Sequence, residues 1–170
     1  MLPHMELREL RADEGLAYRE IRLRALREAP DAFASTFEEE SVQPESFWRE
    51  LIAQTAEAMQ AALIAVDRGD GSLGGTTFVR LSSDPPHDGY VGGMWLDQDL
   101  RGQGWGDALL EAGERFAQRL GSRNLELWVS ASNPSALRFY ERNGYRLTSI
   151  EEPQSSGIVA RRMLKSLLSM

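Results

Sequence analysis

One segment organises the chain: Tyr90-Val-Gly-Gly-Met-Trp-Leu96, then Asp97–Leu100, then Arg101-Gly102-Gln103-Gly104-Trp105-Gly106. Its first part has the length and composition of a strand, and its glycine-rich turn leads into a long amphipathic helix. The first amides of a helix have no partner within the helix and carry a partial positive charge, which suits phosphate oxygens. Glycine lets the backbone approach an anion closely and adopt positive φ, and Arg101 adds a charge. The segment therefore predicts an anion site between strand and helix.

Two common phosphate loops do not match this turn. A P-loop requires a lysine next to Ser or Thr after its last glycine, but Lys165 is the only lysine in the chain. A dinucleotide fingerprint, G-x-G-x-x-G, would need its third glycine at the position of Asp107. Taken alone, the turn leaves a second interpretation open, in which the glycines only start a helix.

Downstream of the turn, the pattern alternates between helix and strand. Residues 104–120 carry an apolar stripe at helical spacing and end at Gly121, and residues 125–130 alternate as a strand does. Asn133-Pro134 is typical of a helix start, and Asn143-Gly144 of its end. Two further strands are predicted at residues 145–150 and 158–164.

Upstream, the predicted order is a short strand, two helices and a hairpin. We expect these elements at residues 6–10, from Asp13 to near Pro30, from Pro44 through Thr55, and at residues 61–66 and 73–81. The arginines of the first helix, Arg19, Arg22, Arg24 and Arg27, are interpreted as mostly a solvated face. The order predicts a mixed sheet flanked by helices.

Two motifs resemble one known family. Arg101-x-x-Gly104-x-Gly106 is similar to the [QR]-x-x-G-x-[GA] signature of the GNAT superfamily of N-acetyltransferases. The string from Asn133 through Ala136 and Phe139-Tyr140 to Gly144-Tyr145 also resembles the cofactor-binding half of that family. The resemblance is close over about residues 60–150. It implies an α/β (α+β) fold with a mixed, mostly antiparallel sheet of six to seven strands flanked by about four helices, in one acetyltransferase domain over residues 1–170.

The resemblance also implies a binding site for acetyl-coenzyme A. Backbone amides of residues 102–106 would hold the pyrophosphate, and the pantetheine arm would pair with residues 94–96 like an added strand. Gly92 and Gly93 fit this arrangement, because glycine inside a strand often marks a bulge or a close approach to a ligand. The cofactor-binding residues implied in this way are Met94, Trp95, Leu96, Arg101, Gly102, Gln103, Gly104, Trp105, Gly106, Asn133, Ala136, Phe139 and Tyr140.

The chemistry implied is acetyl transfer to a primary amine of a small molecule by direct attack in a ternary complex. Tyr140 is the catalytic candidate, since a phenol with a reference pKa of ~10 can protonate a departing thiolate. Strand amides around residues 94–96 would stabilise the developing oxyanion. The general base stays unassigned, because residues 90–96 contain no carboxylate. We interpret Glu126 as solvated and His87 as an exposed loop residue.

The acceptor is not identified by the sequence. By resemblance, residues 31–43 and 151–157 line its pocket, and the runs Glu38–Glu40 and Glu151–Glu152 would favour a cationic amine, although charge runs are usually solvated. Phe33, Phe37 and Trp48 are candidates for apolar walls or for the core. The alternatives left open are a protein N-terminal or lysine acetyltransferase and a non-catalytic acyl-coenzyme-A-binding module.

Composition excludes several other classes. The chain of 170 residues has no cysteine, two histidines and a formal charge of -7, which argue against a zinc site, any other metal site and nucleic-acid binding. The longest apolar run, residues 61–66, is far shorter than the ~20 residues that span a bilayer. We therefore expect a cytoplasmic protein with no membrane partner, and leave a monomer and a homodimer open. Residues 1–4 are interpreted as an alternative start or a cloning remnant.

Overall fold

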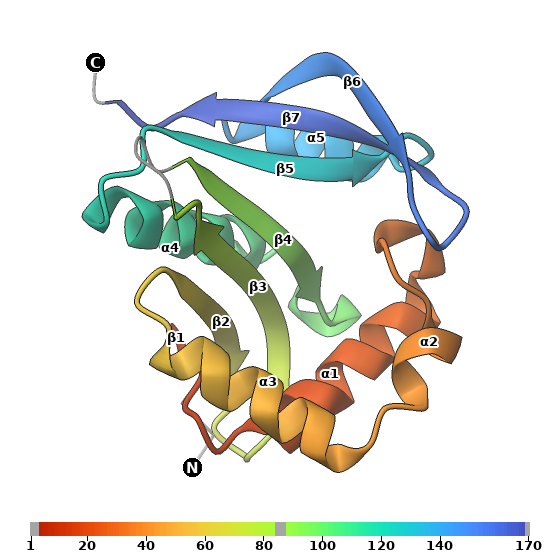
Figure 1. Cartoon of the computed structure of the whole chain (residues 1–170), viewed down its shortest axis with the longest axis vertical. Coiled ribbons are helices and arrows are strands. Elements are labelled where there is room, and N and C mark those ends of the chain that lie inside the picture. Colours follow the sequence, from red (N-terminus) through yellow and green to blue (C-terminus); the bar gives the residue numbers. More distant parts are fainter. Residues whose placement is uncertain (1–3, 84–87, 169–170) are drawn as a thin grey trace.

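The computed structural model describes residues 4–83 and 88–168. Seven strands form one sheet in the order β1-β2-β3-β4-β5-β7-β6 (Figure 1). The strands are β1 (Glu6–Glu9), β2 (Ala61–Asp67), β3 (Leu73–Leu81), β4 (Gly89–Leu96), β5 (Asn124–Ser130), β6 (Arg146–Pro153) and β7 (Val159–Ser166). The α-helices are α1 (Gly15–Glu28), α2 (Phe37–Ser41), α3 (Glu45–Glu57), α4 (Trp105–Arg119) and α5 (Pro134–Arg142), with 3-10 turns at Pro30–Ala32 and Gln98–Leu100.

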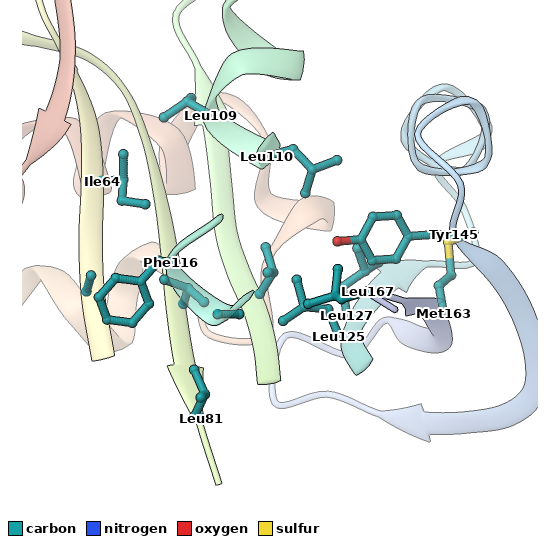
Figure 2. Packing of buried hydrophobic residues seen from close by; sticks show 14 of the residues in the cluster. Ile64, Leu81, Leu109, Leu110, Phe116, Leu125, Leu127, Tyr145, Met163 and Leu167 are labelled. Carbon is teal, nitrogen blue, oxygen red and sulfur yellow. The ribbon is translucent and has the colours of Figure 1, made fainter. Parts of the chain in front are cut away.

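Two apolar clusters cover the two faces of the sheet. Helix α4 packs on β2, β3 and β4, while α1 and α3 pack on β3 and β2. Strand β2 contributes to both clusters, with Ile64 on the α4 side and Leu63 on the other. This explains why its sequence is a continuous apolar run and not an alternating one. Figure 2 shows the α4 side, where Leu109 and Leu110 lie close to the strand residues that they help to bury.

The sheet splits in its middle, at the one parallel pair. Strand β4 pairs with β5 only at Gly89↔Leu125 and Tyr90↔Glu126 among the described residues, and the two strands then diverge (Figure 1). All other neighbouring strands are antiparallel. Helix α4 makes the crossover that a parallel pair requires. The C-terminal half of β4 is therefore left with an edge that no strand covers.

A β-bulge lies in this uncovered half of β4. Phe78 pairs with Gly92 and Thr76 with Trp95, so that two residues of β4 face one residue of β3. Gly93, in the bulge, has φ of +60°, a conformation that side chains with a Cβ rarely adopt. A bulge is one of the two features that Gly92 and Gly93 indicate in the sequence; it is present, and it bends β4 beside the split.

The predicted fold class is confirmed, with two differences in the N-terminal half. Helix α2 was not predicted, although Thr36 and Glu39 form a capping box at its start that the sequence pattern T-x-x-E indicates. The arginine face of α1 is not simply solvated: Arg22 pairs with Glu40 and Arg24 with Asp97, and both pairs are partly buried. Residues 1–3 and His87, which was interpreted as an exposed loop residue, lie outside the described residues.

Candidate active site

A cavity of about 670 Å³ occupies the split between β4 and β5. One wall is the uncovered edge of β4, at Met94, Trp95 and Leu96. The opposite wall comes from the end of β5 and from α5, and the floor near α4 is formed by Arg101 and Gly106. An edge strand presents backbone N–H and C=O groups without partners, so the cavity offers a row of donors and acceptors to an extended ligand.

The glycine turn forms one end of this cavity. Gly102 and Gly104 have φ of +75° and +90°, and Gly104 is the residue that precedes the first turn of α4. A Cβ on either residue would have no atom within 4 Å, so glycine is required here by backbone conformation and not by crowding. A Cβ on Gly106 would lie 3.4 Å from Phe139. The first amides of α4 thus lie at an open surface, as the predicted anion site requires.

The polar side chains of the turn are mostly occupied with the turn itself. Arg101 donates two hydrogen bonds to the carbonyl oxygen of Leu96, at 3.1 and 3.0 Å, and its guanidinium stacks 4.7 Å from the ring centre of Trp95. Gln103 donates to the carbonyl oxygen of Asp99 at 2.7 Å. Trp105 packs against the core and does not line the cavity. Arg101 therefore stiffens the junction between strand and turn and still brings a positive charge to the cavity.

Asp97 anchors the start of the turn to the rest of the sheet. Its carboxylate accepts hydrogen bonds from Arg24 at 2.8 Å and from Arg68 at 2.9 Å, and its backbone N–H donates to Gly74. Burial opposes ionisation of Asp97, but the two arginines outweigh it and hold its pKa below the ordinary value. The ion-pair network links α1, β3 and the cavity, and it fixes where the glycine turn begins.

Helix α5 supplies the side chains on the far wall. Asn133 Oδ1 accepts a hydrogen bond from the Ala136 amide at 3.1 Å and caps the helix, and both residues line the cavity. Phe139 and Tyr140 follow on the next turn, with their rings 5.1 Å apart and edge-on. Burial, and to a lesser extent the neighbouring Tyr90, raises the pKa of Tyr140. Its hydroxyl is therefore protonated at neutral pH and can act as an acid.

The structure gathers most of the predicted site residues, but not all, around one cavity. Gly102, Gln103, Gly104 and Trp105 do not line it and lie at or next to its α4 end. Trp128 and Ser130 of β5 line it and were not predicted. In the sequence, both residues alternate with apolar residues, which indicates that they share one face of a strand. The sequence does not indicate that this face borders a cavity, because the cavity exists only where β4 and β5 separate. The predicted residues that line the cavity are Met94, Trp95, Leu96, Arg101, Gly106, Asn133, Ala136, Phe139 and Tyr140.

The predicted acidic walls are largely engaged within the protein. Glu39 accepts a hydrogen bond from the Thr36 amide in the capping box, and Glu151 pairs with Arg161 at 3.4 Å. Glu126 is not simply solvated, because it accepts a hydrogen bond from Arg162 at 2.6 Å. Phe33 and Trp48 are buried core residues that also line cavities beside the β4 bulge. Glu39 and Glu151 are thus engaged in local contacts, whereas Glu152 lines a cavity beside the β4 bulge.

Within residues 4–83 and 88–168, no group of three or more His, Asp or Glu side chains has the arrangement of a metal site. The helices of the same residues include none with the length and hydropathy needed to cross a bilayer.

Comparison with known proteins agrees with this geometry. The sequence model of the acetyltransferase (GNAT) family matches residues 23–145, and the chain belongs to this family. The resemblance predicted from the two motifs is thus confirmed. A mycothiol acetyltransferase of Propionibacterium freudenreichii is 33% identical over 92 residues, which are 52% of this chain and 28% of that protein. The chain spans about a quarter of the length of the curated relatives that it matches.

Solved structures share the fold over nearly the whole chain. An acetyltransferase of the GNAT family from Streptococcus pneumoniae superposes with a TM-score of 0.81 at 17% identity, covering 96% of this chain and 99% of the other. The yncA protein of Salmonella typhimurium, solved with its cofactor acetyl-coenzyme A, has a TM-score of 0.75 at 14% identity, covering 98% of this chain and 96% of its own. At these identities the likeness establishes the fold alone.

Proposed function

We propose that the protein is an acetyl-coenzyme-A-dependent N-acetyltransferase that acetylates a primary amine of a small molecule. The observation that carries this proposal is the uncovered edge of β4, which leads from the bulge at Gly93 to the open first turn of α4 beyond Gly104. This edge suits an extended ligand whose amide groups can pair with a strand and whose far end is a diphosphate.

The residues present fit acetyl-coenzyme A in three places. The first amides of α4 and the charge of Arg101 would hold the diphosphate, and the edge of β4 at residues 94–96 would pair with the pantetheine amides. The small side chain of Ala136 leaves space between α5 and β4, next to the ring of Phe139. When bound there, acetyl-coenzyme A supplies an activated thioester.

Proton transfer follows from the state of Tyr140. A neutral amine nitrogen would attack the carbonyl carbon as the carbon–sulfur bond breaks. The Tyr140 hydroxyl would give its proton to the departing sulfur, and the resulting phenolate would regain a proton from water. The raised pKa of the Tyr140 hydroxyl means that the proton is present beforehand. Backbone amides near the bulge would stabilise the oxyanion. Residues 90–96 contain no carboxylate, so the proton of the amine leaves through water or through the acceptor side of the site.

A thiol-release assay with acetyl-coenzyme A and a panel of amines tests the proposal. We expect free small-molecule amines to stimulate release and the N-acetyl product to appear by mass spectrometry. Stimulation by peptides alone would replace the small-molecule acceptor with a protein N-terminus or a lysine. Tight binding of acetyl-coenzyme A by calorimetry, with no release for any amine or peptide, would instead show a non-catalytic binding module.

A further inference from the structure

Two smaller cavities meet at the β4 bulge. One, of about 330 Å³, reaches toward β5 and β6, and the other, of about 380 Å³, reaches toward α3. They share four residues, which are Arg22, Tyr90, Gly92 and Gly93. Tyr140 lines the first of these cavities and also the large cavity described above. An acceptor that reaches the reacting carbonyl through these cavities therefore passes Arg22.

The guanidinium of Arg22 is held so that one edge faces the bulge. Nε and Nη2 donate to the two carboxylate oxygens of Glu40 at 2.9 and 2.8 Å, and Nη2 also donates to Ser35 at 3.1 Å. The ring of Phe33 lies 4.8 Å away and stacks on the guanidinium. Nη1 has no hydrogen-bond partner among the described residues, and it is the atom nearest to a Cβ built on Gly93, at 3.8 Å. Nε and Nη2 are thus engaged within the protein, and Nη1 is the nitrogen that faces the bulge.

Tyr90 offers a second donor at the same place. A Cβ on Gly92 would collide with the Tyr90 hydroxyl, so this hydroxyl lies directly over the strand beside the bulge. Its pKa is raised, mainly by burial, and it therefore keeps its proton at neutral pH. The guanidinium can only donate and carries a positive charge, and the phenol O–H beside it can donate as well. The pair therefore suits an anionic or carbonyl oxygen, and the guanidinium repels an ammonium group.

The walls of the smaller cavity carry opposite charges. Arg22 and Arg80 lie on the side of α1 and β3, and Glu126 and Glu152 lie on the side of β5 and β6. Glu40 neutralises Arg22 in part, yet it also fixes the plane of the guanidinium in an ion pair whose side chains are 16% and 18% exposed. This arrangement fits a molecule with a negative and a positive end better than a simple polyamine.

From this geometry we propose that the acceptor is an amino carboxylate, such as an α-amino acid, whose carboxylate binds Arg22 Nη1 and the Tyr90 hydroxyl while its amine points toward Tyr140. The assignment rests on the proposed acetyltransferase function. It predicts that the enzyme distinguishes an amino acid from the amine that remains when the carboxylate is removed.

The test compares matched pairs, phenylalanine with phenethylamine and alanine with ethylamine, by kcat/KM in the thiol-release assay. We expect the wild-type protein to prefer the carboxylated member of at least one pair. Arg22→Met should reduce the ratio of the two kcat/KM values about tenfold or more, as expected for the loss of one charge-assisted hydrogen bond. Arg27→Met is the matched control, because Arg27 lies on the same helix, stacks on Phe37 and lines neither cavity, and it should keep the wild-type ratio.

The ratio separates recognition from a purely structural role of Arg22. If the arginine only ties α1 to α2, both members of a pair lose activity equally and the ratio stays constant, which would overturn the assignment. A wild-type preference for the decarboxylated amines would overturn it as well. Arg22→Lys keeps a cation for Glu40 and serves if the methionine variant does not fold. Failure of every amine to release thiol would instead refute the acetyltransferase function, and the acceptor assignment with it.

Discussion

Replacing Gly104 by valine tests the diphosphate cradle directly. Gly104 has φ of +90° at the start of α4, and a Cβ there would have no atom within 4 Å. The cost of the substitution is therefore conformational, at least about 1–2 kcal/mol for a residue with a Cβ in the left-handed region. For a chain of this size that cost lowers Tm by roughly 2–8 °C. To relieve the strain the backbone must turn, and the amides of the first turn must move with it.

The expected loss of affinity follows from those amides. One hydrogen bond to a charged group contributes about 1.5–3 kcal/mol, so the dissociation constant of coenzyme A should rise about tenfold to a hundredfold. Isothermal titration calorimetry on folded protein measures this change, with differential scanning fluorimetry for Tm.

Gly121→Val is the matched control for this experiment. Gly121 follows the same helix at its other end, has φ of +85°, and would also place its Cβ in open space. It should lower Tm by a similar amount and leave coenzyme A binding unchanged. Equal affinities for coenzyme A in the two variants would refute the idea that the amides at the start of α4 hold the diphosphate.

Three further substitutions probe the chemistry, the turn and the core. Tyr140→Phe should lower kcat about 10²–10⁴-fold with coenzyme A affinity nearly unchanged; an unaltered kcat would remove Tyr140 from proton transfer. Because arginine partners lower the pKa of Asp97, its stabilisation is present above the ordinary value of 3.8 and disappears as the pH falls through the lower folded value. Asp97→Asn should therefore lower the free energy of unfolding in urea at pH 7, and the difference from the wild-type protein should shrink as the pH falls below 3.8; a pH-independent difference would contradict this. Leu109→Ala, at a fully buried position, should lower the free energy of unfolding by about 2–5 kcal/mol in urea titrations, and a change below about 1 kcal/mol would contradict the packing.

Local sequence patterns predicted most helices and strands. They did not predict side-chain pairing or burial where these depend on contacts between distant segments. The stripe of α4 and the hairpin of β2 and β3 follow from periodicity, because one face of each must be buried. Arg22 has the same helical spacing as its solvated neighbours, and nothing local indicates that Glu40, 18 residues away, would pair with it. Phe47 and Trp48 are adjacent aromatic residues of α3, yet Phe47 is 39% exposed while Trp48 is buried. The docking of α3 on the sheet decided between these two adjacent aromatic rings.

The sequence by itself determined the strand, turn and helix from Tyr90 onward, the family, and the glycines that the turn requires, because backbone conformation and helix ends depend on residues close in the chain. Only the tertiary structure decided that β4 and β5 separate after two residue pairs, that Trp128, Ser130 and Tyr140 line the resulting cavity together, and that the Nη1 group of Arg22 lies next to the bulge. These features depend on the register between strands and on ion pairs between distant segments, and such contacts exist only once the whole sheet has formed.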